Sequence, residues 1–292
     1  MTAELERHCA RLLRLYPAEY RRARGAELLE TLLESAEHGR KRPARREVAA
    51  LVVGALRVRA GRQRRQSVQH SWLAALRAGA LMLLVYSLAN AAVFITMDVA
   101  YGGWSSPRPG GPNPISVALS LCALVAALRY HYRTAVAVVL LSFLVTLAAD
   151  SQASSGDVWR LPLAAVFLLP LLKWRPLPPA GLLKYAPAIP LLLVAAQQAL
   201  SQVFPEVAGI LDRGVLVALC AGALLWLAVD ERVAMALGLL LVNDLLLQVG
   251  FLAVGTYTPN PAALALSIAL TALPPAVLLL TSATTARRRS RL

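Results

Sequence analysis

Three polar residues interrupt a long apolar run near the carboxyl end of the chain: Asn243, Asp244 and Gln248. Counting from Val233 at 1.5 Å per residue places Asp244 roughly 16 Å into a run that can cross about 30 Å of hydrocarbon. A carboxylate at that depth is costly, so it must face other helices, find hydrogen-bond partners or take up a proton. These three residues form the candidate intramembrane polar site.

Two interpretations of this site stay open. As a functional site, Asp244 would bind a proton, a cation or a polar substrate. Five residues could complete such a site across the bundle: Asn90, Ser142, Thr146, Gln197 and Gln198. As a structural site, the polar side chains would only hold helices together, as they commonly do in membranes. No Lys or Arg is expected at the depth of Asp244 as a counter-ion, and this favours the structural interpretation.

The elements that carry these residues are expected to lie in lipid. The 292 residues are 58% hydrophobic and 16% charged, with a mean hydropathy of +0.57. A soluble protein is typically about half apolar and about a quarter charged. The excess of apolar side chains therefore predicts an integral membrane protein.

Eight apolar runs follow Trp72 and predict a bundle of about eight transmembrane helices. Four of them, the second, third, fourth and sixth, are short and need flanking residues to cross. The predicted spans are residues 74–97, 115–128, 134–149, 161–172, 185–204, 214–229, 233–254 and 262–284.

The connecting loops alternate in positive charge, which supports this count because Lys and Arg resist translocation. The predicted inner loops and tail carry most of the basic residues, whereas the four outer loops carry only Arg108, Arg160 and Arg213. The pattern predicts that both chain termini lie in the cytoplasm. The expected fold is all-α: a polytopic helix bundle with a small cytoplasmic helical domain in front of it, in a bacterial plasma membrane.

The sequence predicts three parts: a basic three-helix domain over residues 1–70, the bundle over 71–286, and an arginine-rich tail over 287–292. Residues 1–72 hold 16 of the 30 Lys and Arg together with 8 acids. The basic clusters are expected to contact anionic lipid, although marking topology would explain them equally well. The residues predicted to make this contact are Arg62, Arg64, Arg65, Arg287, Arg288 and Arg289.

Several classes of function are disfavoured. The chain lacks GxxxxGK[ST], HExxH, GxSxG and GxGxxG motifs, so no enzyme activity and no cofactor are expected. Its three cysteines, Cys9, Cys122 and Cys220, have neither CxxC spacing nor a neighbouring histidine set, so no metal site or disulfide framework is expected. The basic runs lack interleaved aromatic residues, and direct nucleic-acid binding is not expected.

A short amino-terminal segment resembles a known class. The stretch LLRLYP at residues 12–17, with YRR at 20–22 and RGAELLETLL at 24–33, is similar to the permease-prefix or HAAS-like helices of actinobacterial membrane proteins. The resemblance covers about 60 residues. It implies soluble helices placed before permease spans or other multi-spanning regions, and an association with PadR-type regulators. It transfers no catalytic residue.

Two functions follow as competing hypotheses. The leading one is a non-enzymatic membrane protein whose cytoplasmic segment engages a regulatory or assembly partner, either a PadR-type regulator, an ATPase of the ABC class or a second copy of the chain. The alternative is a transporter or permease component with a pathway at Asp244. Two of the three predicted inner loops are too short for the coupling helix that an ABC ATPase requires, which weakens the case for that partner.

Overall fold

The computed structural model describes residues 3–34, 43–59, 67–100, 113–149, 157–174, 181–204, 206, 208–253 and 261–291. Throughout this part of the chain the regular structure is helical and no strand occurs. The chain divides into two compact units. Unit 1 comprises Met1–Arg65, Ala180–Leu183 and Ala228–Asp230, and unit 2 comprises Gln66–Pro179, Lys184–Leu227 and Glu231–Leu292.

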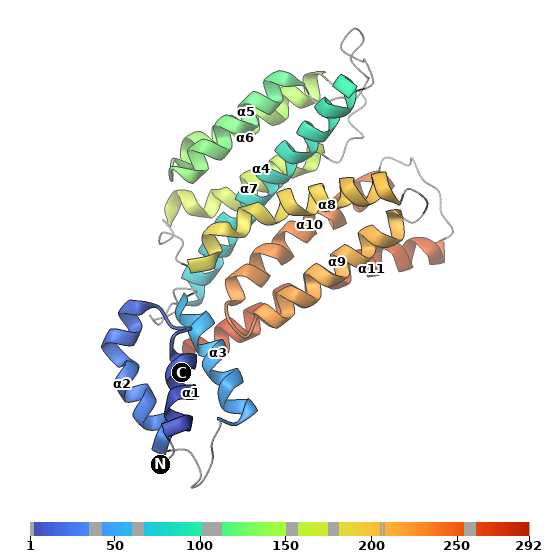
Figure 1. Ribbon diagram of the computed structural model, residues 1–292. Helices are drawn as coiled ribbons and strands as arrows, with labels where there is room; N and C mark the ends of the chain where they lie inside the picture. The colour runs from blue at the N-terminus through green and yellow to red at the C-terminus, as the bar shows by residue number, and fades with distance from the viewer. Residues whose placement is uncertain are drawn as a thin grey trace. The chain divides into compact units, whose positions relative to one another are not determined.

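Unit 1 contains α1 (Ala3–Leu13), α2 (Ala18–Glu34) and α3 (Arg45–Arg59). α1 packs against both α2 and α3, as Figure 1 shows. Apolar side chains of unit 1 meet in a core built from Leu13, Tyr16, Leu51 and Ala55. Leucines of α2 cover this core from one side but remain half-buried.

Close packing in unit 1 centres on Tyr16. Its ring stacks on Tyr20 with centroids 5.2 Å apart. A Cβ added at Gly54 of α3 would collide with the Tyr16 hydroxyl, so the tyrosine must shift before a larger residue can stand at this crossing. Also in unit 1, Arg57 donates from Nε to the carbonyl oxygen of Ala228 at 2.8 Å. The three helices therefore pack into a defined tertiary structure.

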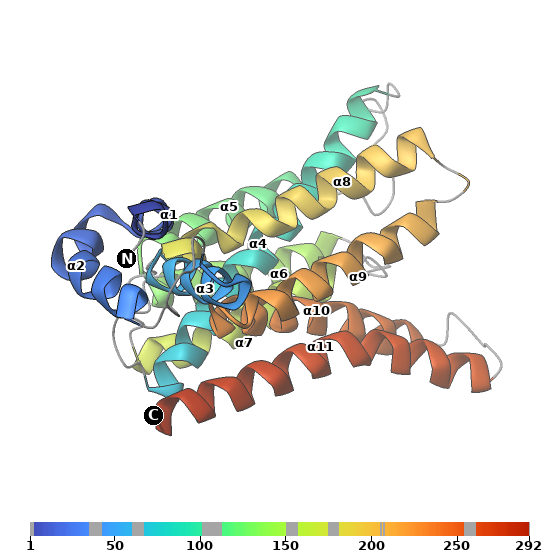
Figure 2. The same ribbon diagram turned by 60° about the horizontal axis from the view of Figure 1, so that its bottom comes forward.

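Unit 2 contains the apolar helices (Figures 1 and 2). Among the residues that the structure describes, four helical segments are long and apolar enough to cross a membrane: Val68–Met97, Leu183–Val203, Glu231–Gly250 and Ala265–Arg288. In chain order the elements are α4 (Val68–Ala100), α5 (Pro114–Leu128), α6 (Tyr132–Ala149), α7 (Asp157–Lys173), the 3-10 helix η2 (Gly181–Ala188), α8 (Ile189–Val203), α9 (Ala208–Trp226), α10 (Glu231–Ala253) and α11 (Pro261–Arg291).

Each run proposed as a span coincides with a helical segment, with differences at the ends. The run at 185–204 is divided into η2, which contains Pro187, and α8, which has Pro190 in its first turn. Proline lacks a backbone donor, which explains the break. The predicted tail from Arg287 continues α11 as far as Arg291. α4 begins at Val68, two residues before the predicted end of the amino-terminal domain.

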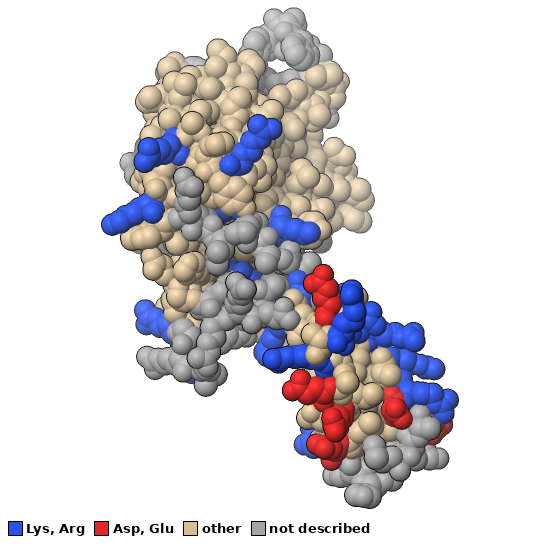
Figure 3. All heavy atoms as spheres, turned by 90° about the vertical axis from the view of Figure 1, so that its left-hand side faces the viewer, with Lys and Arg blue, Asp and Glu red and all other residues tan. Residues whose placement is uncertain are grey.

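α4 and α10 form the centre of unit 2, whereas α8 and α11 are its most exposed long helices. The outer helices turn large apolar side chains outward: Leu192 is 68% exposed, Leu225 79% and Leu280 67%. Figure 3 shows scattered Lys and Arg on unit 2, whereas unit 1 carries charges of both signs. The apolar surface of unit 2 is suited to an acyl-chain environment and costly in water.

Candidate polar site within the helix bundle

α10 holds the candidate site on its most buried stretch. Residues 234–241 are all buried, and Asn243, one residue beyond the middle of the helix, is 1% exposed. The Ala-rich and Leu-rich sequence favours helix and lets α4, α7 and α11 pack closely around α10. The lack of a side chain at Gly238 permits the close approach of α11, because an added Cβ would lie 2.9 Å from Cγ of Leu279. The polar side chains are thus held by a rigid helix.

Asn243 and Asp244 interact directly. Asn243 donates from Nδ2 to Oδ1 of Asp244 at 3.2 Å. The Oδ1 atom of Asn243 is buried and has no hydrogen-bond partner among the described residues. An unsatisfied buried acceptor costs about 1–3 kcal/mol. The pair therefore retains one unused acceptor inside the bundle.

Arg160 corrects the expectation that Asp244 has no counter-ion. The sequence placed Arg160 in an outer loop, but it lies in the first turn of α7 and is only 8% exposed. Its guanidinium carbon is 4.2 Å from the ring centroid of Tyr86 on α4. The guanidinium also attracts the Asp244 carboxylate electrostatically. Packing of α4 and α7 thus places a cation over an aromatic face, and its charge acts on Asp244 of α10.

One feature of the sequence pointed to Arg160 as a possible partner for a buried acid. Arg160 was one of only three basic residues in the predicted outer loops, and it directly precedes an apolar run. Lys and Arg are normally concentrated in cytoplasmic loops, so a basic residue at the outer start of a span is a candidate for interaction with an acid inside the bundle. Tyr86 carried no such signal, because its contact depends on how α4 and α7 pack.

Gln248 lies four residues after Asp244, on the same face of α10. It donates from Nε2 to the hydroxyl of Ser267 on α11. Its Oε1 atom is buried and has no hydrogen-bond partner in the described part of the chain. Gln248 therefore links α10 to α11 and extends the polar region beyond Asp244.

The partners expected from the sequence lie elsewhere or are already engaged. Asn90 donates to the carbonyl oxygen of Tyr86 on its own helix, at 3.1 Å. Ser142 and Thr146 bond to serines of α5, as described below. Gln197 and Gln198 are half-buried on α8, and no hydrogen bond to Asp244 is recorded for either. Asp244 instead accepts a hydrogen bond from its neighbour Asn243 and is attracted electrostatically by Arg160.

A second polar cluster joins α5 to α6. The Ser142 hydroxyl donates to the Ser116 carbonyl oxygen at 2.9 Å and lies 3.0 Å from the Ser120 hydroxyl. The Ser116 hydroxyl lies 2.7 Å from that of Thr146. Ser142 is fully buried. Every hydroxyl has a partner, so this cluster acts as interhelical glue.

Ser142→Ala is expected to destabilise the α5–α6 pair by about 1–2 kcal/mol, because it removes contacts to two α5 serines. The measurement is reversible unfolding in mixed micelles, followed by circular dichroism. The matched control is Thr134→Ala, which removes an exposed hydroxyl that bonds only to its own turn. If both variants unfold at the same denaturant fraction, the cluster does not hold the helices together.

A second buried arginine lies on α4. The Arg77 guanidinium is 4.2 Å from the ring centroid of Tyr130 and donates to the carbonyl oxygen of Leu128 at 3.4 Å. Tyr130 adopts a left-handed backbone conformation with φ of 64° in the turn after α5. A non-glycine residue there is strained by about 1 kcal/mol or more. The contact with Arg77 gives a reason for tyrosine at this position.

Comparison with known protein families, characterised proteins and solved structures finds no match for this chain. Among the described residues, no three His, Cys, Asp or Glu side chains lie together as a metal site would require. The chemical character of the bundle therefore rests on its own geometry: the buried Arg77 and Arg160 over tyrosine rings, and the hydrogen-bonded Asn243 and Asp244 on α10.

The residues proposed to contact anionic lipid are placed only in part. Arg62, Arg64 and Arg65 lie outside the described residues. Arg287 and Arg288 are exposed in the last turns of α11, where positive charge also suits the carboxyl end of the helix dipole. Arg289 lies on the same helix, and its side chain is not among those described.

Proposed function

We propose that this chain is a non-enzymatic, multi-pass protein of the bacterial plasma membrane, in which α4 to α11 supply eight crossings and both termini lie in the cytoplasm. The outward leucines of α8, α9 and α11 support the proposal, because acyl chains would cover them at no cost. The Lys and Arg of the loops support the orientation. The short helices among the eight cross by borrowing flanking residues.

The proposed role is regulation or assembly through the cytoplasmic helices of unit 1. One observation carries it: α1, α2 and α3 pack around a core of their own, while their charged side chains lie outside. A small folded unit with a charged, solvent-exposed surface suits protein docking better than membrane burial. The resemblance to prefix helices of the HAAS-like class points the same way. Partners of the proposed kinds are a PadR-type regulator, an ABC-type ATPase or a second copy of the chain.

Deletion of residues 1–66 tests this role. Membranes containing the tagged full chain or the deletion variant are crosslinked, solubilised and purified, and the co-purifying proteins are compared. The full chain is expected to retain partners that the deletion loses, although α4 to α11 still insert. The control is Gly25→Ala, whose added methyl group makes only an ordinary contact with Cβ of Arg21, so unit 1 stays folded. Equal recovery from the deletion variant would contradict the proposal.

A second candidate is favoured by the electrostatic attraction between Arg160 and Asp244. An ionisable pair between membrane helices is a recognised feature of proton and solute pathways. In this alternative the chain is a transporter or permease component. Asp244→Asn is then expected to abolish solute movement or efflux resistance while expression and insertion persist. Normal transport by a well-folded Asp244→Asn variant would eliminate this candidate.

A further inference from the structure

The charges of α2 are divided between its two halves. After Glu19 in the first turn, three arginines, Arg21, Arg22 and Arg24, occupy its first half, and three glutamates, Glu27, Glu30 and Glu34, occupy its second half. Helix dipoles favour bases in the last turn, where α2 carries Glu34 and no basic residue. The charge order at the carboxyl end of α2 is therefore unfavourable in an isolated helix.

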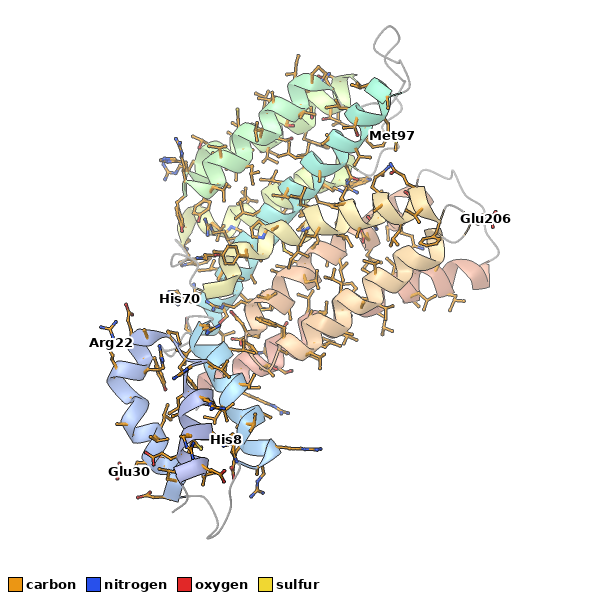
Figure 4. All side chains as sticks on the ribbon, viewed as in Figure 1. His8, Arg22, Glu30, His70, Met97 and Glu206 are labelled. Carbon is orange, nitrogen blue, oxygen red and sulfur yellow. The ribbon has the colours of Figure 1, made fainter. Side chains whose placement is uncertain are left out.

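The outer face of α2 carries a mixed stripe. Positions 22, 26, 30 and 33 recur at helical spacing and share one side. Arg22, Ala26 and Glu30 on this stripe are exposed, and Leu33 is half-buried. Figure 4 shows Arg22 and Glu30 on the side of α2 that points away from α1 and α3. Within the described residues, no ion pair is recorded for either side chain.

α2 is also the helix that the core of unit 1 holds least. None of its residues is fully buried, whereas α3 buries Leu51 and Ala55. An exposed, charged and partly apolar helix face suits an interface with another polar helix. Acidic residues on the stripe would repel an anionic lipid surface.

We propose that α2 binds the same helix of a second copy of this chain, antiparallel, about a two-fold axis that passes beside Ala26. Arg22 and Glu30 lie four residues before and after Ala26, so each Arg22 then faces Glu30 of the partner subunit. Both ion pairs form together because a two-fold interface is reciprocal. The proposal rests on the assembly role proposed above and names its partner.

This arrangement accounts for the charge order of α2. In the antiparallel pair, the arginine half of each α2 lies beside the glutamate half of the other. The small side chain of Ala26 lets the two helices approach closely at the axis. A parallel pair would place Arg22 against Arg22 and is therefore excluded by charge.

A charge exchange tests the pairing in the full chain. Two differently tagged copies are co-expressed, solubilised in mild detergent, and the fraction that co-purifies is measured. Arg22→Glu in both copies is expected to weaken association about tenfold, and Glu30→Arg in both copies similarly, because two attractive pairs become repulsive. One copy with Arg22→Glu and the other with Glu30→Arg should associate like the native chain, since both pairs are restored.

The matched control is Arg24→Glu, which makes the same charge change on a different side of α2 and should leave association unchanged. The proposal would be overturned if the mixed pair lost as much association as two copies carrying the same substitution. It would also be overturned if two copies with Arg22→Glu associated as well as two native copies.

Cysteine crosslinking locates the axis independently. Ala26→Cys is placed in a full chain that also carries Cys122→Ser and Cys220→Ser, and membranes are treated with a copper oxidant. Cys9 can stay because its side chain is 2% exposed. Burial, and to a smaller extent the negative charge of Glu47, also raises the pKa of its thiol. A disulfide-linked dimer is expected for Ala26→Cys but not for Thr31→Cys, which lies on another face. A monomer from Ala26→Cys would contradict the proposed axis.

The two proposals fail in distinguishable ways. If deletion of residues 1–66 removes a different protein and the charge exchange has no effect, unit 1 docks a partner but not its own copy. If neither experiment changes any association, unit 1 has no assembly role.

Discussion

Replacement of Asp244 by leucine is expected to lower the free energy of unfolding of unit 2 by about 1–3 kcal/mol, because the buried Asn243 loses its hydrogen-bond acceptor and Arg160 loses an electrostatic attraction. Arg160 is only 8% exposed. The contact with the Tyr86 ring remains, but an aromatic face compensates only part of the lost charge. Unfolding in mixed micelles measures the loss.

The double variant Asp244→Leu with Arg160→Leu separates a charge pair from a packing defect. Replacing both members of a buried pair by apolar residues is often neutral or stabilising. The double variant is therefore expected to recover most of the stability that either single change loses. Additive losses in the double variant would show that the two charges do not interact, and the site would then need a different explanation.

The same double variant distinguishes the two interpretations of the site. If the chain with both leucines folds and restores the phenotype of a strain lacking the protein, the charge pair is structural. If it folds but does not restore that phenotype, the charges are needed for function. Asp244→Asn provides the conservative comparison, because it can keep a hydrogen bond to Asn243 while removing the charge.

Gly54→Ala is expected to destabilise unit 1 by about 2–3 kcal/mol. Alanine in place of a helical glycine usually stabilises by about 0.5–1 kcal/mol. At Gly54, however, the added carbon would collide with the hydroxyl of Tyr16, whose ring is buried and stacked on Tyr20. Overpacking of this kind outweighs the gain in propensity. Limited trypsin cleavage of the full chain in membranes reports the loss, since unit 1 is rich in arginine.

Two variants verify the cause. Tyr16→Phe removes the conflicting hydroxyl, so Gly54→Ala combined with Tyr16→Phe should resist trypsin nearly as well as the native chain. Gly25→Ala in α2 has only ordinary contact with Arg21 and should resist slightly better than native. If Gly54→Ala is as resistant as Gly25→Ala, α1 and α3 do not cross as described.

The sequence predicted the helices of unit 2 well, because long Leu- and Ala-rich runs have few alternatives to helix. It also placed Asn243 and Asp244 together, since one helix fixes their separation. The meeting of Arg160 with Tyr86 could not be predicted, because it depends on how α4 and α7 pack. A local pattern specifies the position of a residue along its own helix but not which helix it faces.

The serine cluster and Tyr130 show the same limit. Ser142 and Thr146 were assigned to the neighbourhood of Asp244 from their apparent depth, but they bond to serines of α5. A short turn joins α5 to α6 and makes them neighbours. The contact between Tyr130 and Arg77 joins residues far apart in sequence. The polar partners of a membrane helix thus follow from the order in which helices pack.

The central claim is that the apolar helices lie in the membrane with both ends of the chain in the cytoplasm, where unit 1 can meet its partner. Labelling of intact cells with a membrane-impermeant maleimide tests it most directly, with Thr31→Cys on α2 and Ser290→Cys on α11 as reporters. Ser105→Cys, in the loop predicted to lie outside, serves as the positive control. The account predicts that Ser105→Cys labels in intact cells, whereas the other two label only after the membrane is permeabilised. Labelling of either reporter in intact cells would contradict the account.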